Sequence, residues 1–343
     1  MSKTSIKSIA ELMNLSPGTV SIVLNGRGDE LRISKSTQER IMDAAKNLGY
    51  QPNVHARRLR QKTKDKPAAI IGVLWSTQYS SDVLVRFFDG IQHAILEDNV
   101  NIEVVYKPYP YSGIDRIADV FQTNPFNGVI VFGASDQDVE YVKSVTTSMP
   151  LVLFNRMNDR YSSVCVDDFK TGAKVAELFH ARGHRDVGVV ESTLELRHHA
   201  QRKYGFVSTC EALGLRIAPQ HMLKGHYEAE GGRQVSEALV QCDSLPTALF
   251  FTLDSMVPGA FPVFERNGVR VPGDIEVVAY SDSAVNTMLR PSLTVVDLPV
   301  QQLVQEAIRL ILQMIDGDMK RPVSVFGDTF FVFRESCGGF PEK

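Results

Sequence analysis

The sequence predicts an α/β protein in which a small helical head precedes a larger body of doubly wound parallel sheets. Two observations carry this prediction. Apolar residues in 6–24 recur at spacings of three and four, whereas from Ala68 onward apolar runs alternate with amphipathic segments. The 343 residues suffice for two or three domains, and a hydrophobic content of 43% with 22% charged residues is typical of a globular chain with an ample core.

Charge is distributed unevenly along the chain. Residues 1–66 hold 13 Lys or Arg against 6 Asp or Glu, and the remaining residues hold 24 against 34, which gives the net charge of −3. A basic head on an acidic body suits an N-terminal segment that meets a polyanion. A solvated basic tail is the alternative, but this head also contains apolar helix faces.

The head begins with two short amphipathic helices joined by a tight turn. Ser16 followed by Pro17 predicts that the second helix begins at Pro17, because Ser is a favoured N-cap and Pro is tolerated at the first helical position. Such a pair is typical of a helix-turn-helix, whose second helix enters the major groove of DNA, although a plain helical hairpin remains open. Ser36 with Glu39 predicts a capping box for a third helix through Leu48.

A charged segment separates this head from the body. Residues 53–60 carry three arginines and predict one or two helical turns, too short and too polar to be stable without a partner. Residues 61–67 form a charged linker that ends at Pro67. The sequence therefore predicts a helical head over 1–52, a short helix and linker over 53–67, and a body over 68–343.

The body shows the alternation expected of parallel sheets covered on both faces. Expected strands are 69–75, 101–106, 128–133, 150–155, 186–190, 247–251, 275–280 and 329–333. Expected helices are 82–97, 114–121, 138–145, 200–212, 231–240, 254–267 and 300–315. Residues 292–296 are interpreted as a crossover between two lobes, since the chain is long enough for two.

Two facing lobes would place a small-molecule site in the cleft between them, because ligands of open α/β sheets bind beyond the carboxyl ends of the strands. Asn155, Tyr227 and Trp75 lie at expected strand ends or in the following loops and are candidates for this cleft. For Trp75, simple burial is an equal alternative.

The cysteines and the N-terminus indicate a cytoplasmic protein. Cys165, Cys210, Cys242 and Cys337 are far apart and form no CxxC pair, which suits a reducing compartment. The N-terminus lacks the apolar core of a signal peptide, and no run of about 18 apolar residues occurs, so we expect neither secretion nor a membrane span.

Motifs of catalysis are missing from the sequence. His180 and His184 in HARGH have the spacing of helical zinc ligands but lack the glutamate of HExxH. No GxSxG, GxxxxGK[ST] or GxGxxG pattern occurs, and Asp167 with Asp168 is interpreted as the capped start of a helix. We therefore predict no catalytic site, no cofactor and no metal.

Several ordered motifs resemble the lactose-repressor (LacI/GalR) family of bacterial transcription regulators over essentially the whole chain. The head carries IAELMNLSPGTVSIVLNG and ERIMDAAKNLGYQPNVHARRLR. The body carries VDDFKTGAKVAELFHARGHRDVGVV, RKYGF, NGVRVPGDIEVVAYSD and RPSLTVV. The resemblance implies a DNA-binding head, a hinge helix, and an effector-binding body shaped like a periplasmic binding protein.

The resemblance also implies a homodimer on a pseudo-palindromic operator. Paired hinge helices would fold on the DNA and open its minor groove with Leu59, which follows Ala56. An apolar wedge between base steps kinks DNA at an unstacking cost that added contacts offset. A small hydrophobic contact with the body is the alternative role of Leu59.

The recognition helix has few hydrogen-bond donors for bases. Thr19 and Ser21 are hydroxyl residues suited to phosphates or base edges, and the family's base-reading positions fall on Pro17, Gly18 and Ile22. Because these three side chains carry no donor, we expect apolar contact between Ile22 and thymine methyls, with greater reliance on DNA deformability. The expected DNA-binding residues are Ser16, Pro17, Gly18, Thr19, Ser21, Ile22, Asn25, Tyr50, Asn53, Ala56, Arg57 and Leu59.

In the body, the resemblance places Arg202 in the effector cleft, where its five donors suit hydroxyl, carboxylate or phosphate oxygens. A surface ion pair is the alternative. The family's other ligand positions fall on Asp254, Ser281 and Asp282, and two of its usual polar groups are replaced here. Fewer carboxylates around Arg202 would suit an anionic or less hydroxylated effector better than a plain hexose.

Together these observations predict a DNA-binding transcriptional repressor gated by a sugar or a related small molecule. One alternative is a solute-binding protein without a DNA role, which leaves the head unexplained. Another is a regulator with a protein corepressor. The sequence does not define the effector, the direction of its effect, the operator, or the choice between dimer and tetramer.

Overall fold

The computed structural model describes residues 6–24, 28, 31–47, 68–77, 81–193, 196–319 and 321–341. The chain divides into two compact units, Met1–Ala68 and Ala69–Lys343. None of the helices in these ranges is both long and apolar enough to cross a membrane.

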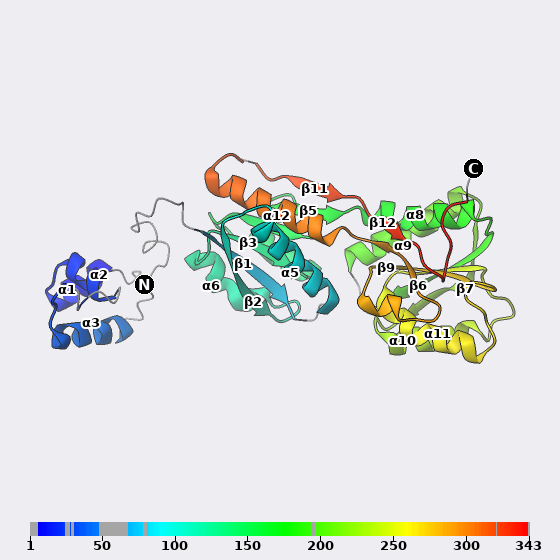
Figure 1. Cartoon of the computed structure of the whole chain (residues 1–343), viewed down its shortest axis with the longest axis horizontal. Helices are drawn as coiled ribbons and strands as arrows, with labels where there is room; N and C mark the ends of the chain where they lie inside the picture. Colours follow the sequence, from blue (N-terminus) through cyan, green and yellow to red (C-terminus); the bar gives the residue numbers. More distant parts are fainter. Residues whose placement is uncertain are drawn as a thin grey trace. The chain divides into compact units, whose positions relative to one another are not determined.

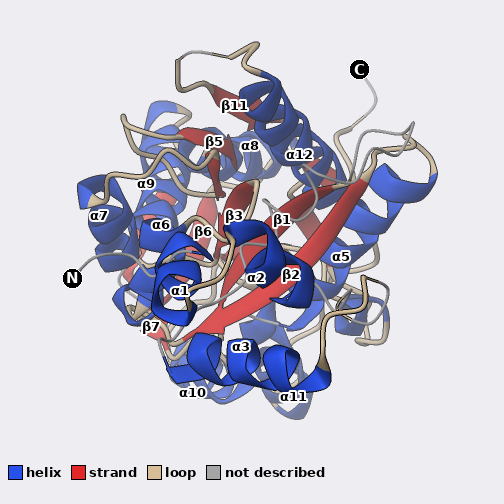
Figure 2. Ribbon diagram, turned by 90° about the vertical axis from the view of Figure 1, so that its left-hand side faces the viewer, coloured by secondary structure: helices blue, strands red, loops and turns tan. Residues whose placement is uncertain are grey.

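The N-terminal unit packs three helices around a small apolar core (Figure 2). They are α1 (Ile6–Met13), α2 (Pro17–Leu24) and α3 (Lys35–Asn47). Ile9, Val20 and Ile41, one from each helix, are fully buried against one another. The helical spacing of apolar residues in the sequence therefore predicted this core correctly.

Side-chain caps define where two of these helices begin. The hydroxyl of Ser16 accepts a hydrogen bond from the backbone N–H of Thr19 at 3.0 Å, which confirms the predicted start of α2 at Pro17. For α3 the prediction was wrong, because the helix begins at Lys35 and the cap is Ser34, whose hydroxyl accepts from the N–H of Thr37 at 3.3 Å. Adjacent hydroxyl residues made the first helical residue ambiguous in sequence.

The second unit contains two six-stranded sheets, one in each lobe of the body (Figure 1). The first sheet has the order β11-β5-β4-β3-β1-β2, and all its pairings are parallel. Its strands are β1 (Ala69–Ser76), β2 (Ile102–Tyr109), β3 (Gly128–Phe132), β4 (Leu151–Phe154), β5 (Ser162–Val166) and β11 (Ser324–Gly327).

The second sheet has the order β12-β10-β9-β8-β6-β7 and is parallel except for the antiparallel edge strand β12. Its strands are β6 (Asp186–Ser192), β7 (Arg216–Gly225), β8 (Ala248–Phe251), β9 (Glu276–Tyr280), β10 (Thr294–Asp297) and β12 (Phe330–Val332). The predicted doubly wound parallel architecture is confirmed in both lobes.

Helices cover both faces of each sheet (Figures 1 and 2). On one face of the first sheet lie α5 (Ser81–Leu96) and α12 (Val300–Asp316). On the other face lie η1 (Ile114–Ile117), α6 (Ala118–Thr123) and α7 (Asp136–Ser144). On one face of the second sheet lie α8 (Asp168–Ala181) and α9 (Arg197–Ala212). On the other face lie α10 (Ala229–Leu239), η2 (Asp254–Met256) and α11 (Val257–Arg266). The short helix η3 (Ala284–Thr287) follows β9.

The chain passes between the lobes three times, after β5, after β10 and after β11. The interpretation of residues 292–296 as a crossover was therefore wrong, because Thr294–Asp297 forms β10 inside the second sheet. The crossing lies at Leu298 and Pro299, immediately before α12. Because only two residues separate the apolar strand from the helix, the sequence contained no loop that would indicate the position of the crossing.

Close packing of α8 and α9 fixes the second lobe's side of the cleft. A Cβ at Gly172 would lie within 1.9 Å of the backbone oxygen of Arg202, and one at Gly205 within 2.0 Å of that of Phe169. Only glycine permits this approach. The contact brings the start of α8, at Asp168, beside Arg202 on α9.

Candidate functional site

The start of α2 offers the residues expected to face DNA. Ser16, Pro17 and Gly18 are exposed at the N-terminus of the helix, and Thr19 and Ile22 are partly exposed one turn further. Val20 and Val23 of the same helix are buried and face the core of the head. Of these exposed or partly exposed residues, only Ser16 and Thr19 carry a polar side chain, and their hydroxyls bond each other at 2.8 Å.

Ser21 departs from the expectation that it faces DNA. Its side chain is 8% exposed, because its position on α2 turns it toward the packed side of the helix. The remaining expected DNA-binding positions, Asn25, Tyr50, Asn53, Ala56, Arg57 and Leu59, lie outside the described residues.

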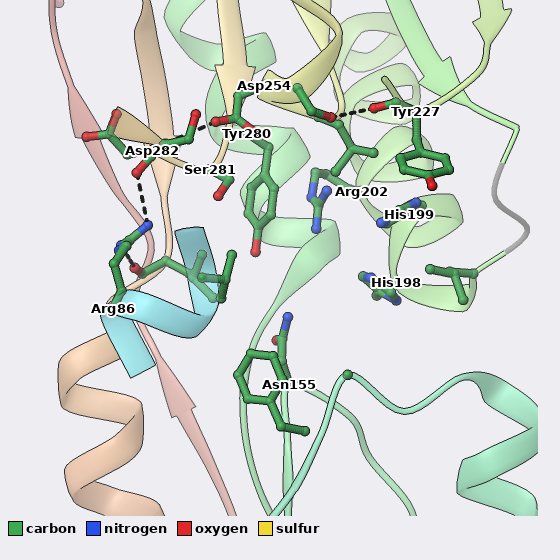
Figure 3. Close-up of a pocket in the computed structure, with 18 of the residues that line it drawn as sticks. Arg86, Asn155, His198, His199, Arg202, Tyr227, Asp254, Tyr280, Ser281 and Asp282 are labelled. Atoms are coloured by element: carbon green, nitrogen blue, oxygen red, sulfur yellow. Dashed lines mark hydrogen bonds between the residues drawn. The ribbon is translucent and has the colours of Figure 1, made fainter. Parts of the chain in front are cut away.

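A cavity of about 370 Å³ lies between the two lobes of the body (Figure 3). Six of the seven residues expected at the cleft line it, namely Asn155, Arg202, Tyr227, Asp254, Ser281 and Asp282. Asn155 follows β4 and Ser281 follows β9, so both lie beyond the carboxyl ends of parallel strands. Both adopt positive φ, 52° and 81°, a strained backbone conformation that is concentrated at ligand sites.

Trp75 does not line this cavity, which corrects its assignment to the cleft. Its side chain is 2% exposed in the core of the first lobe. The indole stacks on Phe132 at 4.0 Å between ring centroids, and Phe132 in turn lines the cavity. Burial, the alternative considered for Trp75, is what the fold requires of a large apolar side chain near the end of a central strand.

Arg202 lines the cavity but is held in a buried ion pair. It is 0% exposed, and its Nε and Nη2 donate to Asp168 Oδ1 at 3.0 and 2.5 Å, while Nη1 donates to the carbonyl of Thr252 at 2.8 Å. Its guanidinium carbon lies 3.2 Å from the ring centroid of Tyr280. The surface ion pair considered for Arg202 is therefore wrong. Burial raises the pKa of Asp168, and the neighbouring charge of Arg202 opposes that rise.

Two carboxylates of the cavity, Asp282 and Asp254, are engaged by the protein itself. Both oxygens of Asp282 accept from the guanidinium of Arg334, at 2.9 and 2.7 Å. Asp254 Oδ2 accepts from the backbone N–H of Ser283 at 3.0 Å and from Asn286 Nδ2 at 2.9 Å. Burial raises the pKa of Asp254, and these hydrogen bonds oppose the rise.

Two histidines also line the cavity, and the sequence assigned them no role there. His198 and His199 open α9 together with Arg202 (Figure 3). Burial lowers the pKa of both imidazoles well below 6.5, and the positive charges of Arg156 and Arg202 lower it further. Positions 198 and 202 are four apart, so they share one helix face, and that spacing was the available signal.

Two contacts join the lobes near the cavity. Arg86 of α5, which lines the cavity, donates to Asp297 Oδ1 and Oδ2, at 3.0 and 2.5 Å, and to the carbonyl oxygen of Asp282 at 3.3 Å. In an adjoining pocket, the backbone N–H of Arg197 donates to Asp136 Oδ2 at 3.2 Å. Closure or opening of the lobes must change these contacts.

Metal ligation finds no support in the described ranges. No group of three His, Cys, Asp or Glu side chains there is arranged to hold an ion. His184 instead contacts Thr247 Oγ1 at 2.9 Å and Glu276 Oε2 at 3.0 Å. His184 therefore ties the segment after α8 to the second sheet.

Comparison with known proteins agrees with both parts of the chain. Residues 5–53 match the family described as bacterial regulatory proteins, lacI family, and residues 176–337 match the periplasmic binding protein-like domain. The "Probable HTH-type transcriptional repressor ExuR" of Bacillus subtilis (strain 168) is 30% identical over 340 residues, which cover 96% of this chain and 97% of that protein.

Solved structures show the same fold. A LacI family transcription regulator from Clostridium acetobutylicum is 29% identical with a TM-score of 0.73, covering 78% of this chain and all of that one. The CelR–cellobiose complex is 22% identical with a TM-score of 0.69, and the match covers 97% of this chain and all of that one. The lac repressor dimer bound to operator and the anti-inducer ONPF is 21% identical with a TM-score of 0.67, and the match covers 98% of this chain and all of that one. Because the chain is 30% identical to the repressor ExuR over nearly its full length, and its first part matches the lacI family, it belongs to the LacI family of bacterial regulatory proteins.

Proposed function

We propose that this protein is a transcriptional repressor whose binding to operator DNA is controlled by a small molecule in the cavity of the body. The observation that carries the proposal is the union, in one chain, of a helix-turn-helix unit and a two-lobed body that encloses a cavity of about 370 Å³. A solute-binding protein would have no use for the first unit. We assign residues 1–52 to DNA binding, 53–67 to a hinge, and 68–343 to effector binding and dimerisation.

The effector would act by changing the relative position of the lobes. Asn155 and Arg86 belong to the first lobe, and Arg202, Asp254 and Tyr227 belong to the second, so one ligand can contact both. A ligand shifts such an equilibrium only by its differential affinity for the two states. The cellobiose complex of a structural relative supports a sugar or sugar derivative as the effector.

DNA recognition would combine weak base reading with hinge insertion. Ile22 is the apolar side chain that α2 presents for thymine methyls, and Gly18 permits close backbone approach. From the hinge, Leu59 would wedge the minor groove, while Arg57 would neutralise phosphates without regard to sequence.

A homodimer would place two heads on a pseudo-palindromic operator. An exposed apolar surface on the first lobe supports it, because Val85 and Phe88 of α5 lie exposed beside Tyr106 of β2, with the rings of Phe88 and Tyr106 6.2 Å apart. The structural relative solved with operator is a dimer. We further propose that the protein acts in the cytoplasm and has no catalytic role, as expected for a regulator of transcription.

The proposal is tested with the full-length protein on duplex DNA. Operators are selected from a random pool, and fluorescence anisotropy measures affinity for the selected sequence and for a scrambled one. Ile22→Ala should lower the preference for the selected sequence by roughly tenfold, since the loss of recognition at one base pair typically costs about 1–3 kcal/mol. Arg57→Ala should weaken binding to both sequences alike.

The two variants serve as controls for each other, because each changes one side chain of the DNA-binding part. Failure of the wild-type protein to select any sequence would overturn the proposed function. Equal losses on both sequences for Ile22→Ala would show instead that α2 only positions the protein.

A further inference from the structure

Basic side chains gather on one wall of the cavity. His198, His199 and Arg202 project from the first turns of α9, and Arg156 approaches from the segment after β4. Arg156 is 6% exposed and Arg202 is fully buried. Two permanently charged groups and two imidazoles therefore meet at one place that water reaches poorly.

Positively charged groups surround His198. Arg156, His199 and Arg202 each disfavour a further proton on its imidazole, although Arg202 is also paired with the carboxylate of Asp168. An anion placed in this corner would experience the opposite effect and be stabilised. It would also favour protonation of His198, which would turn both ring nitrogens into donors.

His198 also has an unmet hydrogen bond. Its Nδ1 is buried and has no partner within the described parts of the chain, although the ring borders the cavity. A buried polar atom without a partner is rare in folded proteins and calls for a ligand or a water. His199 differs, because its Nδ1 lies 3.2 Å from the hydroxyl of Ser192.

The opposite end of the cavity suits hydroxyl groups. Figure 3 shows Asp254, Ser281 and Asp282 grouped away from His198 and His199. Arg334 occupies both oxygens of Asp282, and Asp254 Oδ2 accepts from Ser283 and Asn286. Because a carboxylate can accept several hydrogen bonds, Asp254 can also accept one from a ligand hydroxyl. The hydroxyl of Ser281 adds a group that can both donate and accept.

We propose that the effector is a sugar acid, a single hydroxylated ring or chain that carries one carboxylate. The carboxylate lies against Arg156 and His198, and the hydroxyls reach Asp254 and Ser281. A cavity of about 370 Å³ suits one monosaccharide unit, at the small end of the range for ligand pockets. This inference rests on the proposed effector site but names the chemistry that the site selects.

The test uses ligand pairs that differ in one group. Isothermal titration of the full-length protein compares glucuronate with glucose and galacturonate with galactose, where a carboxylate replaces a hydroxymethyl group. At least one acid should bind tenfold or more tightly than its matched hexose. Hexose 6-phosphates form a third arm, and tighter binding of a phosphate than of either acid would overturn the carboxylate assignment.

A variant then locates the carboxylate. His198→Phe keeps a ring of similar size but removes both nitrogens, and it should reduce the preference for the acid to less than about threefold. His93→Phe, on α5 and outside the cavity lining, is the matched control and should keep the full preference. Circular dichroism and thermal melting check that both variants fold.

Three outcomes would overturn the proposal. They are a hexose that binds as tightly as its acid, an unchanged preference in His198→Phe, and no binding of any acid. Each of them leaves the proposed repressor function intact as long as selective operator binding persists, so the two conclusions fail separately.

Discussion

The two lobes contribute different chemistry to the same cavity. The first lobe supplies mainly an apolar surface, in which Phe132 and Phe154 stack with ring centroids 4.8 Å apart and Phe132 lies on Trp75. The second lobe supplies most of the charged and hydroxyl groups, including Arg202 and Asp254. The difference indicates that the first lobe contributes most to the shape of the site, while the second lobe supplies most of the groups that select the ligand, together with Arg86 and Arg156 of the first lobe.

Removing the apolar platform should have the largest effect. Phe132→Ala should lower the free energy of unfolding by about 4 kcal/mol, because it leaves a cavity beside Trp75. Urea denaturation measures this change, and Phe132→Leu is the control with a smaller loss of volume. Among ligands that still bind, affinities should fall by similar factors for acids and neutral sugars. A loss confined to one class would show that the first lobe also selects chemistry.

Breaking the ion pair of the second lobe should have a somewhat smaller effect on stability. Arg202→Met leaves Asp168 buried without its cation and should cost about 3 kcal/mol, measured by urea denaturation. Adding Asp168→Asn should recover part of that loss, since the buried charge is removed as well. If the single and double variants are equally unstable, the packing of Arg202 on Tyr280 matters more than its charge.

The smallest expected effect is a dependence of stability on pH. Burial and the nearby arginines hold the pKa of His198 and His199 well below 6.5. Below pH 6.5 these two imidazoles are therefore protonated in the unfolded chain but remain neutral in the folded protein. Stability without ligand should therefore fall as pH decreases from 7 to 5.5, by roughly 1 kcal/mol per histidine over that interval. The double variant His198→Phe/His199→Phe should show a shallower slope in thermal melts. An identical slope would place the pH sensitivity elsewhere.

The sequence predicted the elements that carry strong apolar patterns. Central strands such as β3 and β8 are continuous apolar runs, and the amphipathic α12 lies within one residue of its expected range. Four strands were missed, namely β5, β7, β10 and β11, of which β10 was interpreted as a crossover. β7 and β11 are edge strands with many exposed positions, and β5 is a short run with two serines, so none produced a clear pattern.

The candidate site was predicted less completely, because its contacts join distant parts of the chain. Arg202 and Asp168 are 34 residues apart, and Arg86 and Asp297 are 211 apart. Periodicity could place each residue on a helix or at a strand end, but it could not pair them. Ser21 shows the same limit on a smaller scale, because its burial depends on how α2 packs within the head.

The contact of α8 with α9 has a consequence for changing the specificity of this regulator. Gly172 and Gly205 fix the distance between the two helix backbones, and Arg202 and Asp168 are positioned by backbone as much as by side chains. Substitutions elsewhere in the second lobe will therefore leave the basic wall in place. New ligand shapes are better sought by altering the aromatic side chains of the first lobe, because the described glycines of that lobe show no such close approach of two helix backbones.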